Sequence, residues 1–585
     1  MGAAGTSVTA YYTGLSAIAP EILLALGMVA LLVWEAFAKK NGLGRKAGYM
    51  TIGLFSAALV LGLLVPSQKQ ALFSGMIVID PFFQFFRTFS LGAGILGVTV
   101  ALASSEVESD RTGEYYALSI ALVIGMIFMS CASDLMMLYL SIELVSLMSY
   151  VLAGFRPKNR RSAEAALKYV IYGGAASGLM LVGFSILFGI TGTTHLSLIN
   201  TSIMELTSAT AIRGLSADNA AAIPVGLTSG LVLSFSGFAY KIAAAPLHMW
   251  SPDVYEGAPT PFTAFLSTGP KAAGFAALIR FFFVGFANPE HYATNELLAD
   301  VTKLPWPHLI VIVSMITMTI GNFSALGQTN AKRFLAYSSI AHAGYSLIGL
   351  AAFSKFGASS VLLYMAFYLL MNMGAFYVVI WVKERTGTEL IEGFKGLGHK
   401  AGVVAATMAI CLFALTGLPP LAGFVGKYYL FAAALDRGRA YPAIEQCAPA
   451  LRDTLATGDR IACLFNEGTM FYWLAVVAAL NSAVSLYYYA RIVRKMFLEK
   501  PDERSEVDYS VSTSDRAVLI PIGTLLIAGG IFWTPIWNAT VKAVDFHRPT
   551  IAEIRYQSTE NKDSSASAQK AKTDDKAQAV VEESE

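Results

Sequence analysis

The sequence predicts an all-α integral membrane protein. Of its 585 residues, 55% are hydrophobic and only 14% are charged, whereas a soluble chain averages about 25% charged. The apolar residues gather in blocks of about 20, the length that crosses a ~30 Å hydrocarbon layer. The net charge of +2 is spread over short loops and does not indicate nucleic-acid binding.

Apolar blocks between charged or Pro/Gly breaks predict about 14 membrane spans. We place them near residues 17–38, 49–66, 83–104, 115–132, 134–155, 163–190, 222–246, 259–286, 307–327, 334–354, 357–382, 401–433, 469–492 and 516–537.

The orientation follows from the basic residues, because cytoplasmic loops of membrane proteins carry an excess of Lys and Arg. With the N-terminus outside, the inner loops hold 21 Lys and Arg residues and the outer loops hold 8. We therefore expect both termini on the outer side. The polar, charged tail at 541–585 has the composition of a disordered segment.

Ionisable side chains inside the apolar blocks are the first functional candidates. A charge at mid-bilayer costs at least ~2.5 kcal/mol, so such residues are rarely kept without a role. Glu143 lies in the fifth span, about nine residues from Asp134, the nearest charge on its N-terminal side. At 1.5 Å per residue that depth is roughly 13 Å, too deep for a short carboxylate to reach water.

Three lysines interrupt apolar blocks beside helix breaks. Lys241, Lys271 and Lys427 lie close to Gly/Pro breaks at 237–246, 268–270 and 417–420. Broken membrane helices free backbone carbonyls and admit water, which can solvate an ammonium group.

Three further residues have two interpretations each. Lys168 could act with the buried groups, or could form an i,i+4 pair with Glu164 or extend toward the interface. His248 and His342 could relay protons, or could be hydrogen-bonded interface residues. The run 487–489 of three tyrosines is typical of an interfacial belt.

The chemistry of these residues favours proton binding. A buried lysine loses the water that stabilises its charged form, and a nearby carboxylate restores that form. A Glu–Lys pair whose separation changes is therefore a switchable proton site, and lysines in series with hydrated Ser, Thr, Tyr and His form a relay.

The four cysteines show no metal-binding spacing with histidine, so we expect no metal or cofactor in this chain. Cys131 and Cys411 lie in apolar blocks. Cys447 and Cys463 flank the polar part of an insert at 434–468, which the orientation puts on the oxidising side. We predict a disulfide between them, with two incidental thiols as the alternative.

A short motif suggests an internal repeat. Gly-Phe-x-x-Lys occurs at 237–241 and 423–427, in the seventh and twelfth spans. Five spans separate them, so the copies cross the membrane in opposite directions, as in inverted-topology repeats. We predict spans 1–3 in residues 1–114, repeats of five helices in 115–286 and 307–492, and a last loop and span in 493–540.

Three segments resemble the signatures of the antiporter-like subunits of complex I and of Mrp-type cation/proton antiporters. They are His-Met-Trp-Ser-Pro-Asp-Val-Tyr-Glu-Gly-Ala-Pro-Thr-Pro at 248–261, Ala-Tyr-Ser-Ser-Ile-Ala-His-Ala-Gly at 336–344, and Gly-Leu-Pro-Pro-Leu-Ala-Gly-Phe at 417–424. Within this family, a lysine at 427 and about 14 spans are similar to the subunit N branch of NADH:quinone oxidoreductase.

The resemblance implies two inverted five-helix bundles, each with a half-channel for protons. It assigns Glu143 and Lys168 to a modulating ion pair, Lys241 to the first half-channel, Lys271 to the central connection and Lys427 to the exit.

The resemblance also implies a proton-translocating subunit in a bacterial inner membrane, beside other membrane subunits of complex I. The sequence has no GxGxxG fingerprint that follows a predicted strand, so NADH, FMN, iron–sulfur clusters and quinone would be bound by partner subunits. The alternatives are a subunit of a Mrp-type Na⁺/H⁺ antiporter or of a related membrane-bound hydrogenase, and a passive scaffold.

Overall fold

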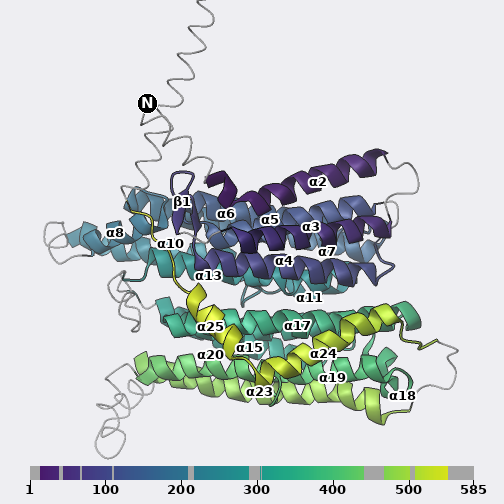
Figure 1. Ribbon diagram of the computed structural model, residues 1–585. Coiled ribbons are helices and arrows are strands. Elements are labelled where there is room, and N and C mark those ends of the chain that lie inside the picture. The colour runs from purple at the N-terminus through teal and green to yellow at the C-terminus, as the bar shows by residue number, and fades with distance from the viewer. Residues whose placement is uncertain are drawn as a thin grey trace, which may run out of the picture.

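The computed structural model describes residues 14–37, 44–65, 69–107, 111–207, 217–288, 304, 306–439, 467–500 and 508–550. Within these ranges the chain forms a bundle of long helices that run along one common direction (Figure 1). Helices α2 to α13 make one half of the bundle, and helices α15 to α24 lie beside them as the other half.

The first half begins with α2 (Ala19–Phe37), α3 (Arg45–Leu64), a hairpin of β1 (Gln70–Leu72) and β2 (Ile77–Ile79), and α4 (Pro81–Leu102). It continues with α5 (Thr112–Cys131), α6 (Leu135–Ala153), α7 (Arg160–Thr191), α8 (Leu196–Leu206), α10 (Ala217–Ile242), α11 (Trp250–Gly257), α12 (Thr260–Leu266) and α13 (Gly269–Gly285).

The second half comprises α15 (Trp306–Leu326), α16 (Ala331–Ala351), α17 (Lys355–Thr386), the turn η2 (Ile391–Phe394), α18 (Leu397–Lys400), α19 (Gly402–Thr416), α20 (Ala422–Arg439), α23 (Glu467–Leu498), α24 (Thr513–Ile531) and α25 (Thr534–Ala543). We call the end of the bundle that carries β1 and β2 the hairpin end, and the end that carries α18 the opposite end (Figure 1).

Eleven helices in the described part of the chain are long and apolar enough to cross a membrane, and each overlaps a predicted span. The three other predicted spans correspond to divided or more polar helices. Residues 259–286 form α12 and α13, residues 401–433 fall on α19 and α20, and α16 contains Lys332, Arg333 and His342. The first division falls just before Gly269-Pro270, which opens α13, and the second falls at Pro419-Pro420, where consecutive prolines disfavour a helix interior.

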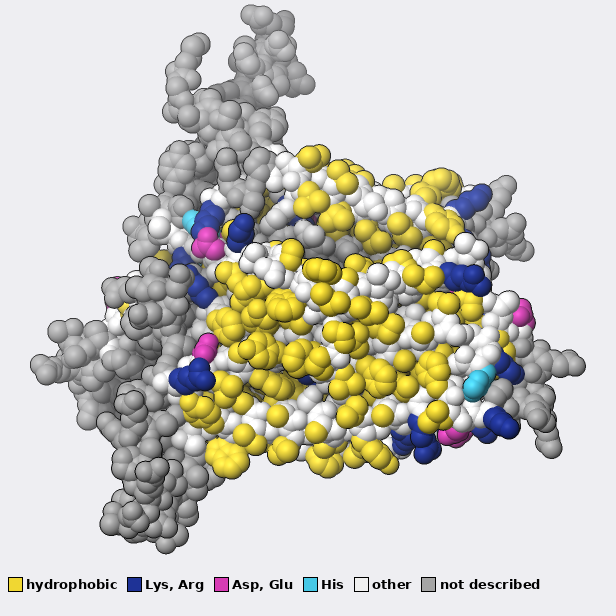
Figure 2. Space-filling model, turned by 60° about the horizontal axis from the view of Figure 1, so that its bottom comes forward, with side chains coloured by type: hydrophobic (Ala, Val, Ile, Leu, Met, Phe, Trp, Pro, Cys, Tyr) yellow, Lys and Arg dark blue, Asp and Glu magenta, His cyan; other side chains and the backbone are white. Residues whose placement is uncertain are grey.

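The surface matches a chain that lies in lipid. A broad band of hydrophobic side chains covers the face shown in Figure 2, and most of its Lys, Arg, Asp and Glu side chains lie toward the two ends of the helices. Large apolar residues such as Leu26, Leu167 and Leu480 are more than 60% exposed. That exposure would be costly in water and is expected where lipid or another subunit covers the helices.

Two long helices end and continue in the same way in the two halves. Both α7 and α17 have 32 residues, and both end at a left-handed glycine, Gly192 with φ 70° and Gly387 with φ 72°. Each glycine lies in a Thr-Gly-Thr sequence. Glycine has no Cβ and adopts this conformation at little cost, which ends the helix there.

The segments that follow these glycines bond to the start of another helix in each half. The amide of Leu135 donates to the Thr194 carbonyl at 2.9 Å, and the amide of Ala331 donates to the Glu389 carbonyl at 2.8 Å. Both helix starts are capped by a side-chain oxygen, from Asp134 for α6 and from Asn330 for α16. The halves thus share a local pattern that spans two helices and their connection.

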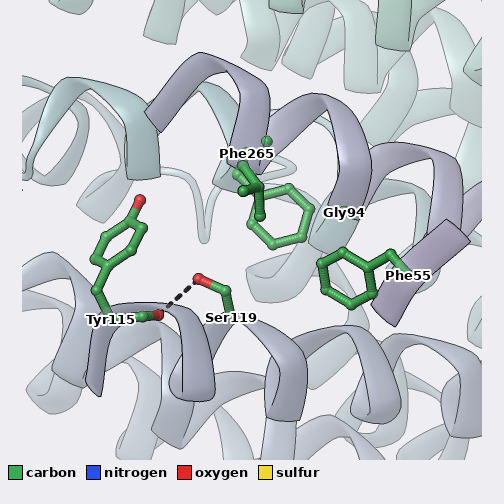
Figure 3. A pocket seen from close by; sticks show the side chains of 7 residues that line it. Phe55, Gly94, Tyr115, Ser119 and Phe265 are labelled. Atoms are coloured by element: carbon green, nitrogen blue, oxygen red, sulfur yellow. Dashed lines mark hydrogen bonds between the residues drawn. The ribbon is translucent and has the colours of Figure 1, made fainter. Parts of the chain in front are cut away.

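The N-terminal helices α3 and α4 pack closely against each other within the first half. Phe55 of α3 faces Gly94 of α4, where an added Cβ would lie 3.0 Å from the Phe55 ring. Between these residues, Tyr115, Ser119 and Phe265 lies a small cavity of about 10 Å³ (Figure 3). The Ser119 hydroxyl donates to the Tyr115 carbonyl and leaves an apolar lining.

The chain after α25 returns to the first half. The backbone amide of His547 donates to Asp80 Oδ2 at 3.1 Å, and Arg548 donates to the Phe283 carbonyl at 2.7 Å. Figure 1 shows this segment running from α25 toward α8. Residues 541–550 of the predicted tail are therefore structured and packed, and 551–585 lie outside the described residues.

The hairpin end also holds a buried ion pair. Arg280 and Asp80 are both fully buried and form two hydrogen bonds, of 2.9 and 2.8 Å. Helix α20 extends to Arg439 and α23 begins at Glu467, so most of the insert 434–468, with Cys447 and Cys463, lies outside the described residues.

Candidate functional site

The candidate site is a row of buried lysines at helix breaks, and Lys241 lies at one end of it. Helix α10 ends directly after this residue, and the chain is not α-helical again until Trp250. Lys241 is 4% exposed and donates a hydrogen bond of 3.1 Å to Ser146 Oγ of α6.

Glu143 lies one helical turn from Ser146 on α6 and acts electrostatically on Lys241. Its Oε1 atom is buried and has no hydrogen-bond partner among the described residues. A buried carboxylate oxygen without a partner is costly, so the nearby ammonium is the charge that offsets it. The structure therefore brings Glu143 to Lys241.

Lys168 lies in a different environment. Its ammonium binds Asp253 Oδ2 at 2.7 Å and Glu164 Oε1 at 2.8 Å, and its side chain is 37% exposed. The i,i+4 interpretation of Lys168 thus describes one of its contacts. The ion pairs found in the described part of the chain do not include Glu143 with Lys168.

Lys271 connects the two halves. It is the third residue of α13, directly after the Gly-Pro break, and is 2% exposed. Its ammonium donates to both the hydroxyl of Ser339 and the Ser339 carbonyl, the latter at 3.0 Å. Ser339 belongs to α16, and the Tyr255 hydroxyl lies 3.5 Å from its Oγ.

His342 lies one turn further along α16 and is 2% exposed. Its Nδ1 forms a short hydrogen bond with the Tyr364 hydroxyl, and its Nε2 lies 3.2 Å from the Tyr489 hydroxyl. Tyr489 in turn bonds Ser338, the neighbour of Ser339. Groups that can both give and accept protons therefore continue from the Lys271 site into the second half.

Lys427 lies at the far end of the row, on α20 just beyond the Pro419-Pro420 break. It is 3% exposed and donates to the Thr416 carbonyl at 2.9 Å and to Ser482 Oγ at 3.1 Å. The His342 ring interacts electrostatically with both Lys427 and Lys271. The imidazole therefore lies within electrostatic reach of both cations.

His248 lies near the row, but its side chain is not part of the hydrogen bonds that link the row to its neighbours. It lies in the non-helical stretch between α10 and α11 and is 8% exposed, and its Nδ1 has no hydrogen-bond partner among the described residues.

The tyrosines of α23 show what sequence reasoning missed. Tyr488 and Tyr489 are fully buried, whereas Tyr487 is 69% exposed. The interfacial-belt interpretation of the run is wrong for the two buried residues. The helical period of α23 could have indicated this difference, because it turns successive tyrosines to different faces of the helix.

At the opposite end of the bundle, a polar cavity of about 670 Å³ is lined by charged residues of both halves. Glu106 accepts from Arg156 at 2.6 Å and also binds Lys383. Burial alone would raise the pKa of this carboxyl, but the charges of Lys332 and Lys383 outweigh it and lower the pKa of Glu106 to about 2.

The described residues include no group of three or more His, Cys, Asp or Glu side chains that could hold a metal ion. Lysines, serines, tyrosines and one histidine dominate the row, and this chemistry suits proton binding more than redox transfer.

The bundle, its broken helices and its buried lysines define a multi-pass membrane protein of the antiporter-like class. Residues 132–444 match the family model described as NADH:quinone oxidoreductase/Mrp antiporter, TM. The chain therefore belongs to this family, and to its NADH-quinone oxidoreductase subunit N branch.

Relatives and solved structures support this placement. NADH-quinone oxidoreductase subunit N of Anaeromyxobacter sp. (strain Fw109-5) is 43% identical over 533 residues, which cover 90% of this chain and 96% of the relative. Subunit N 2 of Sorangium cellulosum is 41% identical over 548 residues, 91% and 98% of the two chains.

Among solved structures, a chain of respiratory complex I from Thermus thermophilus aligns with a TM-score of 0.65 and 28% identity, covering 89% of this chain and 99% of that one. A chain of the Mrp complex from Dietzia sp. aligns with a TM-score of 0.68 and 18% identity, covering 90% and 97%. The latter likeness concerns the fold alone.

Proposed function

We propose that this chain is the proton-translocating N subunit of a bacterial NADH:quinone oxidoreductase. The observation that carries the proposal is the row Lys241, Lys271, His342 and Lys427. Each is almost fully buried, and each is hydrogen-bonded to hydroxyl or carbonyl groups of a neighbouring helix. Buried ionisable groups in series are the parts of a proton relay.

In this relay, Glu143 sets the charge state of the first site. A carboxylate near Lys241 favours the ammonium form, and its displacement or protonation favours release of the proton. The proton then moves to Lys271, and from there past His342 to Lys427, with water bridging the intervals.

Energy for this movement comes from outside the chain. NADH, FMN, iron–sulfur clusters and quinone are bound by partner subunits, and neighbouring membrane subunits transmit the coupling. The names of the relatives, all NADH-quinone oxidoreductase subunits N, support this assignment.

We further propose 14 membrane crossings with two inverted five-helix units, at 115–286 and 307–492. The matched ends of α7 and α17 and the matched caps of α6 and α16 support the repeat. The lysine motif supports it less, because Lys241 precedes its helix break and Lys427 follows its own. A two-fold rotation that relates the two units does not reverse the order of residues along the chain. Two equivalent lysines would therefore both precede their helix breaks or both follow them.

The excess of basic residues in one set of loops supports a chain with both termini on the periplasmic side of the inner membrane. For Lys168 we propose a modulating role at the opposite end of the bundle, exerted through Asp253, to which Arg333 also binds at 2.6 Å. His248 is proposed to serve water access at the first break.

The alternative is a subunit of a Mrp-type antiporter or of a membrane-bound hydrogenase. The Mrp chain shares the fold, and its 18% identity adds nothing about function. The 43% identity to a subunit N over 90% of the chain favours the oxidoreductase.

The test is purification of the chain with its partners, followed by reconstitution in vesicles. We expect NADH-driven proton uptake that the Lys271→Ala variant loses while the complex still assembles. Sodium-driven proton exchange without NADH oxidation, or wild-type proton uptake by Lys271→Ala, would reject the proposal.

A further inference from the structure

Each of the three buried lysines donates a hydrogen bond to a serine hydroxyl on a neighbouring helix. Lys241 binds Ser146 of α6 at 3.1 Å, Lys271 binds Ser339 of α16, and Lys427 binds Ser482 of α23 at 3.1 Å. We call Ser146, Ser339 and Ser482 the lysine-bonded serines.

The lysine-bonded serines are themselves held by a second partner. Ser146 donates to the Ile142 carbonyl at 2.7 Å, and Ser482 donates to the Thr416 carbonyl at 2.9 Å. The oxygen of Ser339 lies 3.5 Å from the Tyr255 hydroxyl. At Ser146 and Ser482 the serine oxygen accepts from the ammonium while its own proton points to a carbonyl. At Ser339 either hydroxyl of the pair with Tyr255 can donate.

A hydroxyl suits a group that gains and loses a proton. It accepts a hydrogen bond from an ammonium, and after rotation it donates one to the neutral amine. A carboxylate would hold the ammonium form, and a carbonyl would leave the amine without a donor. Only a group with both capacities satisfies the lysine in both protonation states.

Because each lysine is buried, it matters that its serine partner can both accept and donate a hydrogen bond. All three lysine residues are at most 4% exposed, and a buried polar group without a partner costs free energy. Lys427 also illustrates how the exchange would work, because its ammonium and the Ser482 hydroxyl donate to the same Thr416 carbonyl. When the lysine loses its proton, this serine can turn from the carbonyl to the amine.

We infer that Ser146, Ser339 and Ser482 are positioning residues of the proton relay, each serving as a reversible hydrogen-bond partner for one lysine through its cycle. The inference rests on the proposed function and adds to it the residues that let each lysine change its charge in place. The serine proton itself is not transferred, since the hydroxyl only rotates.

The structure supplies a matched control for each of these serines on the same helix. Ser149, Ser346 and Ser485 are at most 1% exposed, and each hydroxyl donates to a carbonyl within its own helix, at 2.6, 2.9 and 2.6 Å. None of the three contacts a lysine of the row through these bonds.

The experiment measures the initial rate of proton uptake per NADH oxidised, in vesicles that contain the whole purified complex. We expect Ser146→Ala, Ser339→Ala and Ser482→Ala each to lower this rate roughly tenfold, the change that loss of a hydrogen bond to a charged group produces. The serine-to-threonine variants keep the hydroxyl and should retain most of the rate. The control variants Ser149→Ala, Ser346→Ala and Ser485→Ala should match the wild type.

The lysine-to-alanine variants, measured in parallel, separate the two proposals. If they pump normally, the proposed function fails. If they fail to pump while the three serine-to-alanine variants pump normally, the positioning role is overturned and the relay stands. Equal losses in the control variants, or threonine variants as slow as alanine variants, would also overturn the positioning role.

Discussion

The ammonium of Lys427 lies 4.3 Å from the centre of the Tyr345 ring. Tyr345 is fully buried, and its hydroxyl accepts a hydrogen bond of 3.1 Å from Asn322 of α15. A cation over the face of an aromatic ring in a desolvated site gains about 2 kcal/mol or more. The ring therefore stabilises the charged form of this lysine without adding a counter-charge.

This contact gives the first prediction. Tyr345→Leu should reduce proton pumping at least severalfold, because the ring over Lys427 is lost. Tyr345→Phe keeps the ring and should pump close to the wild-type rate. Proton uptake in vesicles measures both, and equal losses in the two variants would show that the hydroxyl and not the ring matters.

The second prediction concerns the unpaired carboxylate. Glu143→Ala should strongly reduce proton pumping and coupled NADH oxidation while the complex still assembles, because Lys241 then lacks its only nearby carboxylate among the described contacts. Pumping and assembly are measured on the same purified sample. Wild-type pumping by a fully assembled variant would contradict the role of Glu143.

The third prediction tests whether Lys241 must exchange its proton or need only supply a positive charge. Arginine stays protonated at any accessible pH, so it keeps the charge near Glu143 and cannot cycle. We expect Lys241→Arg to pump as poorly as Lys241→Ala. Recovery of pumping with arginine alone would mean that the site acts only through its charge.

The fourth prediction concerns stability. Asp80→Ala leaves the fully buried Arg280 without its carboxylate, a change that typically costs about 3–5 kcal/mol. Thermal unfolding of the purified complex should therefore begin at a lower temperature. Arg494→Ala removes a mostly exposed partner of Glu499 and should leave the unfolding temperature unchanged.

The fifth prediction follows from the lowered pKa of Glu106. Since this pKa falls from 4.5 to about 2 in the folded protein, the carboxylate contributes stability that is present above pH 4.5. That stability is lost as the pH falls toward 2. Glu106→Gln should thus be less stable than the wild type at neutral pH, and the difference should shrink in acid. An unfolding series against pH checks this, and a constant difference would refute it.

Much of the fold could be predicted from composition and hydrophobic length. Eleven predicted spans became membrane-length helices, because apolar blocks and capping residues act locally. The breaks at Gly269-Pro270 and Pro419-Pro420 could also be predicted, since a Gly-Pro or Pro-Pro pair strongly disfavours a helix interior. Single prolines are less decisive, because Pro224 and Pro521 lie inside α10 and α24. The ordered segment 544–550 could not, because its contacts with Asp80 and Phe283 join residues far apart in the chain.

The charged residues of the candidate site could be predicted from the sequence, but the side chains that contact them could not. Lys241, Lys271 and Lys427 are visible as charges in apolar blocks. Ser339, Tyr345 and Tyr489 are ordinary helix residues in the sequence, and only the packing of α16 against α13, α20 and α23 gives them a role. Lys168 shows the same limit, since its partner Asp253 lies on another helix.

The contact between His547 and Asp80 has a consequence for biogenesis. Asp80 and Arg280 are translated well before His547, whose amide adds a further hydrogen bond to Asp80 Oδ2. Final consolidation of the hairpin end must therefore await synthesis of residues 547 and 548. A nascent chain that stops before residue 547 would have every helix of the row and the Arg280–Asp80 pair, and would lack only this last link between the C-terminal segment and the hairpin end.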